Sequence, residues 1–130
     1  MLGLAAFLAL ASQGAAATAA PITEAEQKQL VDLALPRDRP AATTIRLVGP
    51  DKLFPGFVTY LVSWPGAAGA GPAIGGYFDV NPQTGDVFVA TGCKEASNPR
   101  LGRQQHALRQ KLHIGPDDYA RLRKPGPYCR

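Results

Sequence analysis

The segment GYFDVNPQTGDVFVATGC, residues 76–93, restricts the fold of this 130-residue chain more than any other stretch. Two runs rich in β-branched and aromatic residues, 74–80 and 86–91, are separated by NPQTG, and such runs favour strands. Pro82 fixes φ and Gly85 allows a positive φ, so the residues between the runs suit a tight turn. The sequence therefore predicts a β-hairpin that leads into a cysteine.

Two more strands are predicted before the hairpin. In TTIRLVG, residues 43–49, apolar and polar side chains alternate, which is typical of a half-buried strand. FVTYLVSW, residues 57–64, is apolar on both faces, so we expect it at the centre of the sheet. The small-residue segment PGAAGAGPA, residues 65–73, lacks the spacing of a phosphate-binding loop and is expected to be a flexible connection.

A helix is predicted before the strands. In PITEAEQKQLVDLALP, residues 21–36, Thr23 and Glu26 are spaced as a capping box, in which each side chain bonds the other residue's backbone amide. Pro36 cannot continue a helix and is expected to end it.

Two short helices are predicted after the strands. KEASNPRLG, residues 94–102, is expected to be a polar loop. RQQHALRQKLHIG, residues 103–115, has leucines at helical spacing and a glycine stop, and PDDYARLRK, residues 116–124, begins with a helix-starting proline. The order of elements predicts an α+β fold: an N-terminal helix, a four-stranded antiparallel sheet and two short C-terminal helices. Residues 21–130 are expected to form a single domain.

The first twenty residues contain no charged side chain and include an apolar run from Leu2 to Ala11. This run is too short to span a bilayer, which needs about 20 residues. With the small residues Ala17 and Ala19 it is typical of a secretory signal peptide over residues 1–20. We therefore expect a periplasmic or secreted protein without stable membrane insertion after cleavage; a disordered alanine-rich tail is the alternative.

Both cysteines, Cys93 and Cys129, follow this leader. In an oxidising compartment an even pair favours a disulfide bond, and closing this loop would stabilise the fold by about 4 kcal/mol. Such a bridge would hold the C-terminal helices against the sheet. His106 and His113 have no carboxylates at the spacing of a zinc site, so no metal is expected.

Positive charge gathers in the C-terminal third of the chain. The net charge is +4, and residues 94–130 carry an excess of bases while residues 21–93 carry a slight excess of acids. The bases are not interleaved with aromatic residues as they are on nucleic-acid surfaces. A solvated helix face is favoured over a site for an anionic partner, and no nucleic-acid partner is expected.

Patterns that carry catalysis are not found in the sequence. Ser63 and Ser97 lie outside any G-x-S-x-G elbow. Asp117 and Asp118 lie at the expected start of a helix. Complementing the helix dipole is a simpler role for them there than forming an acid pair or a calcium site. We expect no enzymatic activity and no cofactor. An envelope enzyme of unrecognised type stays the alternative, with His106 as the first residue to test.

The hairpin also carries a family pattern, formed by Tyr77, Phe78, Asp79, Val80, Thr84, Gly85 and Val87. With the preceding helix and meander, roughly residues 23–91, it resembles the small periplasmic PepSY-type domains and the wider cystatin-like group. This resemblance implies an accessory domain that regulates an envelope enzyme. The plan of a helix and a curved sheet is also similar to that of small exported immunity proteins of bacterial toxin systems.

The predicted strands hold more aromatic residues than a four-stranded core needs. If helices cover one sheet face, the other face would expose an aromatic patch, and such patches often mark interaction sites. The residues expected to bind a partner are Tyr60, Trp64, Tyr77 and Phe88. The alternative is that both faces are covered and these residues are core. The preferred interpretation is an exported binding module that inhibits or neutralises a protein partner in the cell envelope, as an immunity protein does.

Overall fold

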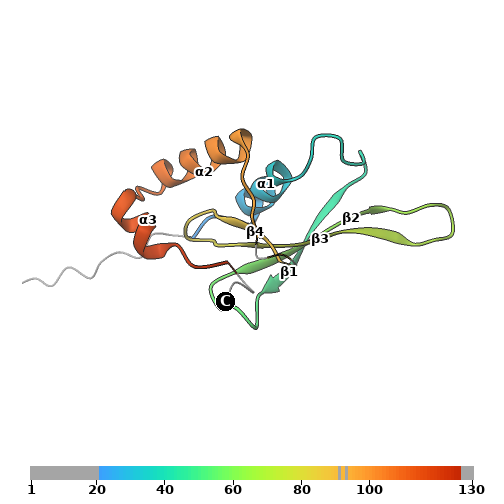
Figure 1. The fold of residues 1–130 in the computed structure, drawn as a ribbon, viewed down its shortest axis with the longest axis horizontal. Coiled ribbons are helices and arrows are strands. Elements are labelled where there is room, and N and C mark those ends of the chain that lie inside the picture. Colours follow the sequence, from blue (N-terminus) through green and yellow to red (C-terminus); the bar gives the residue numbers. More distant parts are fainter. Residues whose placement is uncertain (1–20, 91, 93, 127–130) are drawn as a thin grey trace, which may run out of the picture.

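The computed structural model describes residues 21–90, 92 and 94–126. Five strands form one antiparallel sheet in the sequential order β1-β2-β3-β4-β5 (Figure 1). The strands are β1 Thr44–Pro50, β2 Val58–Pro65, β3 Pro72–Val80, β4 Val87–Val89 and β5 Lys94–Glu95. The helices are α1 Glu24–Ala34, α2 Pro99–Lys111 and α3 Pro116–Leu122. The predicted α+β class is therefore confirmed.

The helices are segregated to one side of the sheet. In Figure 1, α1 and α2 lie over one sheet face and α3 lies beside the turn between β3 and β4. No described helix covers the opposite face. The β2–β3 hairpin extends beyond the rest of the domain as an arm, with its tip at residues 66–71. The fold thus has a covered sheet face, which forms the core, and a second face on which a site can be built.

The N-terminal helix begins and ends where the sequence predicts. The Thr23 amide donates to Glu26 Oε2 (2.9 Å) and the Glu26 amide donates to Thr23 Oγ1 (3.3 Å), which completes the capping box. The helix ends at Ala34, because the next residue adopts an extended conformation before Pro36. These caps satisfy backbone groups that a helix end leaves without partners.

The predicted turn of the β3–β4 hairpin is also confirmed. The Asn81 amide donates to the Asp86 carbonyl (2.9 Å), and the Gly85 amide donates to the Asn81 carbonyl (2.8 Å). Gly85 has a φ of +79°, and a Cβ placed on it would lie 3.2 Å from Ile22 and 3.3 Å from Leu30. Glycine is required here both for its backbone conformation and for the close approach of the core.

The core fills the space between α1, α2 and the covered sheet face. Its fully or almost fully buried members are Ile22, Leu30, Val31, Leu35, Tyr60, Val62, Phe78, Val80, Val87, Leu101 and Leu108. One polar pair lies among them: the Tyr60 hydroxyl donates to Gln27 Oε1 (2.8 Å). Burial raises the pKa of Tyr60 to about 12, so this hydroxyl remains a neutral donor at physiological pH.

The number of strands and both bounds of the second helix differ from the sequence prediction. The sheet has five strands instead of four, because Lys94 and Glu95 pair with β4 where a loop was expected. The second helix begins at Pro99, earlier than predicted, because the Asn98 side chain accepts the Leu101 amide (2.9 Å) and caps it. It ends at Lys111, and Gly115 is the N-cap of α3 instead of a helix stop.

Two predictions lie outside the described residues. The leader over residues 1–20 and the disulfide between Cys93 and Cys129 fall on positions that the structure does not describe, so both stay predictions, as does the single-domain organisation. Within the described part of the chain, no helix is long and apolar enough to cross a membrane.

Candidate functional site

Strand register decides which side chains occupy the uncovered sheet face. Tyr60 and Val62 of β2 point into the core, so Thr59 and Leu61, which alternate with them along the strand, face the other way. Thr59 pairs with Asp79 and Leu61 with Tyr77 on β3, while Asp79 pairs with Phe88 on β4. The name "open face" is used below for the face that carries Thr59, Leu61, Tyr77, Asp79 and Phe88.

The four aromatic residues expected to bind a partner do not form one exposed patch. Tyr60 is fully buried in the core, and Trp64 packs against the same core. Phe88 is on the open face but is 5% exposed, because Phe57 contacts it edge to face with ring centroids 5.7 Å apart. Tyr77 is 40% exposed on the open face. The expected exposure is therefore wrong for Tyr60 and Phe88, and a role of any of the four in binding stays a prediction.

Trp64 has a structural partner that explains its position. A Cβ placed on Gly75 would lie 2.4 Å from Cζ3 of the Trp64 ring and 3.1 Å from Val62. The indole therefore lies against the bare backbone of β3, where any larger residue would displace it. The Trp64 ring thus packs from β2 onto β3.

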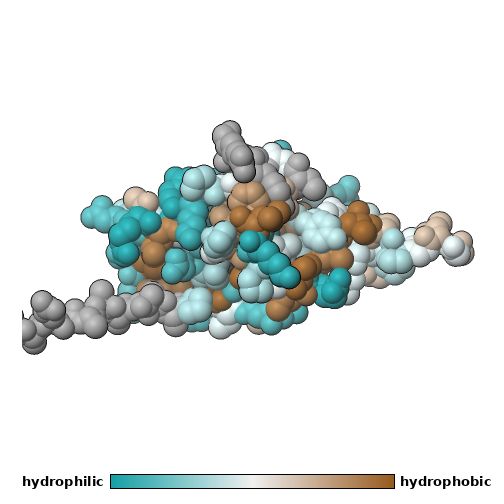
Figure 2. Space-filling model, turned by 90° about the horizontal axis from the view of Figure 1, so that it is seen from below, coloured by the Kyte–Doolittle hydropathy of each residue, from teal (hydrophilic) through white to brown (hydrophobic). Residues whose placement is uncertain are grey.

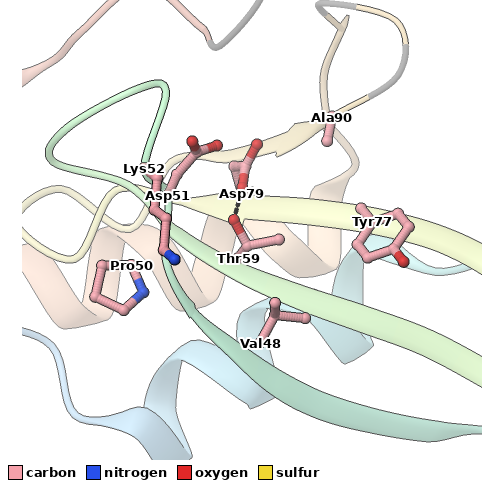
Figure 3. A pocket seen from close by; sticks show the side chains of 8 residues that line it. All are labelled: Val48, Pro50, Asp51, Lys52, Thr59, Tyr77, Asp79 and Ala90. Atoms are coloured by element: carbon pink, nitrogen blue, oxygen red, sulfur yellow. Dashed lines mark hydrogen bonds between the residues drawn. The ribbon is translucent and has the colours of Figure 1, made fainter.

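A pocket of about 750 Å³ opens on the open face (Figure 3). It lies between the end of β1, the loop that follows β1, and the central strands. Its lining residues are Val48, Pro50, Asp51, Lys52, Thr59, Tyr77, Asp79 and Ala90. The pocket combines apolar walls with three charged side chains, a composition suited to binding.

Asp79 is the unusual member of this pocket. Its side chain is fully buried, and Thr59 Oγ1 donates to its Oδ1 (2.5 Å; Figure 3). Oδ2 is also buried, and it accepts no hydrogen bond from any residue that the structure describes. Burial raises the pKa of this carboxyl above its usual value; the Thr59 hydrogen bond opposes that effect and the charge of Asp51 adds to it. A buried polar atom without a partner is rare and requires an explanation.

A second carboxylate stands beside it. Asp51 Oδ1 accepts the amides of Leu53 (2.8 Å) and Phe54 (2.9 Å), which fixes the loop after β1 and holds the Asp51 side chain in place. In Figure 3 the carboxylates of Asp51 and Asp79 lie side by side at one end of the pocket. The site therefore concentrates negative charge at a point where the sheet is otherwise apolar.

Two large apolar side chains are exposed on β1 and β3. Val48 is 52% exposed, and it lies at the β-bulge that interrupts the pairing of β1 with β2 between Leu47 and Gly49. Ile74 on the arm is 60% exposed. Figure 2, which shows this side of the molecule, displays hydrophobic residues in brown among polar ones. Mixed surfaces of this type are typical of non-obligate protein interfaces.

A different polar cluster lies on the other side of the β3–β4 turn. Asp86 is 2% exposed, and its carboxylate accepts hydrogen bonds from Thr84 Oγ1 (2.8 Å), Tyr119 Oη (2.9 Å) and Arg109 Nη2 (3.1 Å). The Arg109 guanidinium also donates to the Thr84 carbonyl (3.0 Å) and lies 4.0 Å from the centre of the Tyr119 ring. This cluster, which we call the Asp86 clamp, joins α2 and α3 to the hairpin.

Sequence reasoning missed this clamp. The charge of Arg109 was assigned to a solvated helix face, although it follows Leu108 on the buried side of α2. No sequence pattern pairs the Tyr119 hydroxyl with Asp86. One sequence signal could have indicated the clamp: Asp86 directly follows the T-G turn. A carboxylate at that position can accept hydrogen bonds from elements packed on the hairpin.

Residues considered for catalysis are not brought together. His106, on α2, is exposed, and His113 follows α2 at a positive φ of 56°. Asp118 pairs with Arg121 on the same short helix (3.0 Å), consistent with a surface role. Within residues 21–90, 92 and 94–126, no group of three or more His, Cys, Asp or Glu could hold a metal ion.

The fold and this site define a small α+β protein with one uncovered, pocketed sheet face. No family model matches the chain, and no curated protein sequence matches it, so the PepSY-type and cystatin-like resemblance gains no support from them. The fold is similar to one chain in the structure of a type VI secretion system effector–immunity complex from Pseudomonas protegens. That match has a TM-score of 0.62 at 17% identity and covers 78% of this chain and 86% of that chain.

Proposed function

We propose that this protein is an immunity-type binding protein, which neutralises a protein toxin by occluding it with the open face. The observation that carries the proposal is the fold shared with a chain of an effector–immunity complex. That match spans most of both chains, so it includes the sheet and helices together and is more than one common motif.

The open face supports this function physically. Occlusion requires a surface that can be desolvated, and Val48, Ile74 and Tyr77 provide exposed apolar area. Val48 and Tyr77 also line a pocket with charged groups. It requires no nucleophile and no general base, since the protein acts by covering its partner. The rigid core and the Asp86 clamp would keep such a surface preorganised, which lowers the entropic cost of binding.

We further propose that neutralisation takes place in the cell envelope. The proposal rests on the apolar leader over residues 1–20 and its small-residue cleavage site. An immunity protein must be present where the toxin acts, so a leader on this chain implies a toxin that acts after export. In that compartment Cys93 and Cys129 would form their disulfide.

The test is co-expression with the product of the neighbouring gene. That product, directed to the periplasm of a laboratory bacterium, should arrest growth, and co-expression of this chain should restore it. The two purified proteins should elute together in size-exclusion chromatography. Loss of rescue when the leader is deleted would support action in the envelope.

Two controls separate the alternatives. His106→Ala should protect as well as the wild type, because binding does not use this exposed side chain; loss of protection would favour an enzyme. Val48→Asp should protect less, because it places a charge on the open face. A neighbouring product that neither arrests growth nor binds this chain would contradict the immunity proposal.

A further inference from the structure

We propose that the pocket ending at Asp79 receives the guanidinium of an arginine side chain supplied by the protein partner. This inference rests on the proposed function, because it names the chemistry by which the open face recognises its partner. The group that needs a hydrogen-bond donor is the buried Oδ2 oxygen of Asp79.

The hydrogen-bonding capacity of Asp79 is only partly used. Oδ1 is bonded to Thr59, whereas Oδ2 has no donor among the described residues. A buried carboxylate oxygen in this condition destabilises the folded protein, because its hydration is lost without replacement. The arrangement is understandable if a donor arrives from outside the chain and the pocket is the route by which it enters.

The charge of the pocket selects a cation. Asp51 and Asp79 lie side by side, and their mutual repulsion is relieved by a positive group placed between them. Lys52 also lines the pocket, but it forms no ion pair with either carboxylate in the described structure. Its side chain is exposed, so it can move aside when another cation enters.

The walls favour arginine over other cations. In the same pocket, away from the two carboxylates, Tyr77 offers an aromatic ring and Val48 an aliphatic surface (Figure 3). A guanidinium is planar, stacks on aromatic rings and is weakly hydrated, whereas an ammonium is compact and strongly hydrated. Divalent metals need about six oxygen ligands, and the described residues here supply no group of three His, Cys, Asp or Glu.

Occupation of the pocket should be linked to protonation. The raised pKa of Asp79 means that the carboxyl holds its proton to a higher pH than usual when no cation is near. A bound guanidinium favours the ionised carboxylate, so the proton leaves as the cation binds. Binding should therefore weaken as the solution is acidified through the pKa of Asp79.

The experiment is an NMR titration of the purified protein with N-acetyl-L-arginine methylamide. The backbone amides of Thr59, Tyr77 and Asp79 should shift together and saturate. The citrulline analogue, which has the same shape without the charge, should bind at least about tenfold more weakly, a difference of 1.4 kcal/mol. Equal binding of the citrulline and arginine probes would overturn the inference.

Matched variants complete the test. Asp79→Asn should weaken arginine binding about tenfold, whereas Asp38→Asn, the same substitution on an exposed loop, should not change it. Tyr77→Leu should weaken it less, because only stacking is lost. An unchanged affinity in Asp79→Asn, or equal binding of the lysine analogue, would contradict the assignment to arginine.

The two proposals fail separately. The titration uses no toxin, so its failure removes the arginine pocket and leaves the growth-rescue result intact. Conversely, a chain that binds the arginine probe but does not rescue growth retains the pocket and loses the immunity function. The dispersion of each variant's amide spectrum establishes that the variant is folded.

Discussion

Asp79 and Asp86 flank the same hairpin turn and are equally buried, yet their surroundings are opposite. Asp86 accepts hydrogen bonds from three side chains, one of them a guanidinium. Asp79 accepts one, from Thr59, and one of its oxygens has no partner in the described structure. The two carboxylates have the same chemistry, so the difference lies in what the fold supplies around them.

This difference separates structure from function within a single hairpin. A fully satisfied buried network fixes the elements that meet there, and the Asp86 clamp fixes the two C-terminal helices. A partly satisfied group lowers stability, and natural proteins retain such groups chiefly at functional sites. The predictions below test this contrast from the largest expected effect to the smallest.

Arg109→Met should destabilise the protein most. It leaves Asp86 buried with no positive partner, and removing one member of a buried pair destabilises by about 3–5 kcal/mol. The Arg109 side chain is 20% exposed, so we expect about 3 kcal/mol, at the low end of that range. Chemical denaturation measures it. Arg121→Met, which breaks an exposed pair, should change the free energy of unfolding by less than about 0.5 kcal/mol.

Tyr119→Phe should lower the free energy of unfolding about half as much as Arg109→Met. It removes one hydrogen bond to the Asp86 carboxylate (2.9 Å) and keeps the ring under Arg109. Hydrogen bonds to charged groups contribute about 1.5–3 kcal/mol, and we expect a loss near 1.5 kcal/mol. The control is Tyr77→Phe, whose hydroxyl has no partner among the described residues. Equal losses in the two variants would contradict the role given to the clamp.

Asp79→Asn should act in the opposite direction and increase the free energy of unfolding by about 1 kcal/mol at pH 7. The folded pKa of Asp79 is raised above its usual value of 3.8. The contribution of protonated Asp79 to stability is therefore fully present below the unfolded pKa, near 3.8. That contribution is lost as the pH rises through the folded pKa. The advantage of the variant should vanish near pH 3 and grow with pH. Destabilisation at neutral pH would show that Oδ2 is satisfied in solution.

Val48→Thr should have the smallest effect on stability. Val48 is 52% exposed on the open face, so we expect a change within about 0.5 kcal/mol. The same substitution at Val80, which is fully buried in the core, places a hydroxyl among apolar groups and should destabilise by about 1–3 kcal/mol. Denaturation curves of the pair test whether the open face is dispensable for folding.

Local signals in the sequence were sufficient for much of the fold. The capping box at Thr23, the turn around Gly85 and the strand at 57–64 all depend on residues close together in the chain, and each lies where expected. The α+β class follows from their order. These features are predictable because the physical cause is contained within a few neighbouring residues.

The features that were missed depend on distant residues. The fifth strand exists because β4 offers an unpaired edge to Lys94. The burial of Phe88 depends on contact with Phe57, which directly precedes β2. Asp79 was identified only as part of a turn pattern. Its orphaned oxygen is visible only when the strands on both sides of it are in place.

The sequential strand order has a consequence for how the protein folds. Each strand pairs with its neighbour along the chain, so the meander can assemble from short-range contacts, which favours rapid folding. The Asp86 clamp joins residues that are 23 and 33 positions apart, and we expect it to close late. Variants of the clamp should then accelerate unfolding far more than they slow folding, so damage there would shorten the lifetime of the native state while leaving its formation almost unchanged.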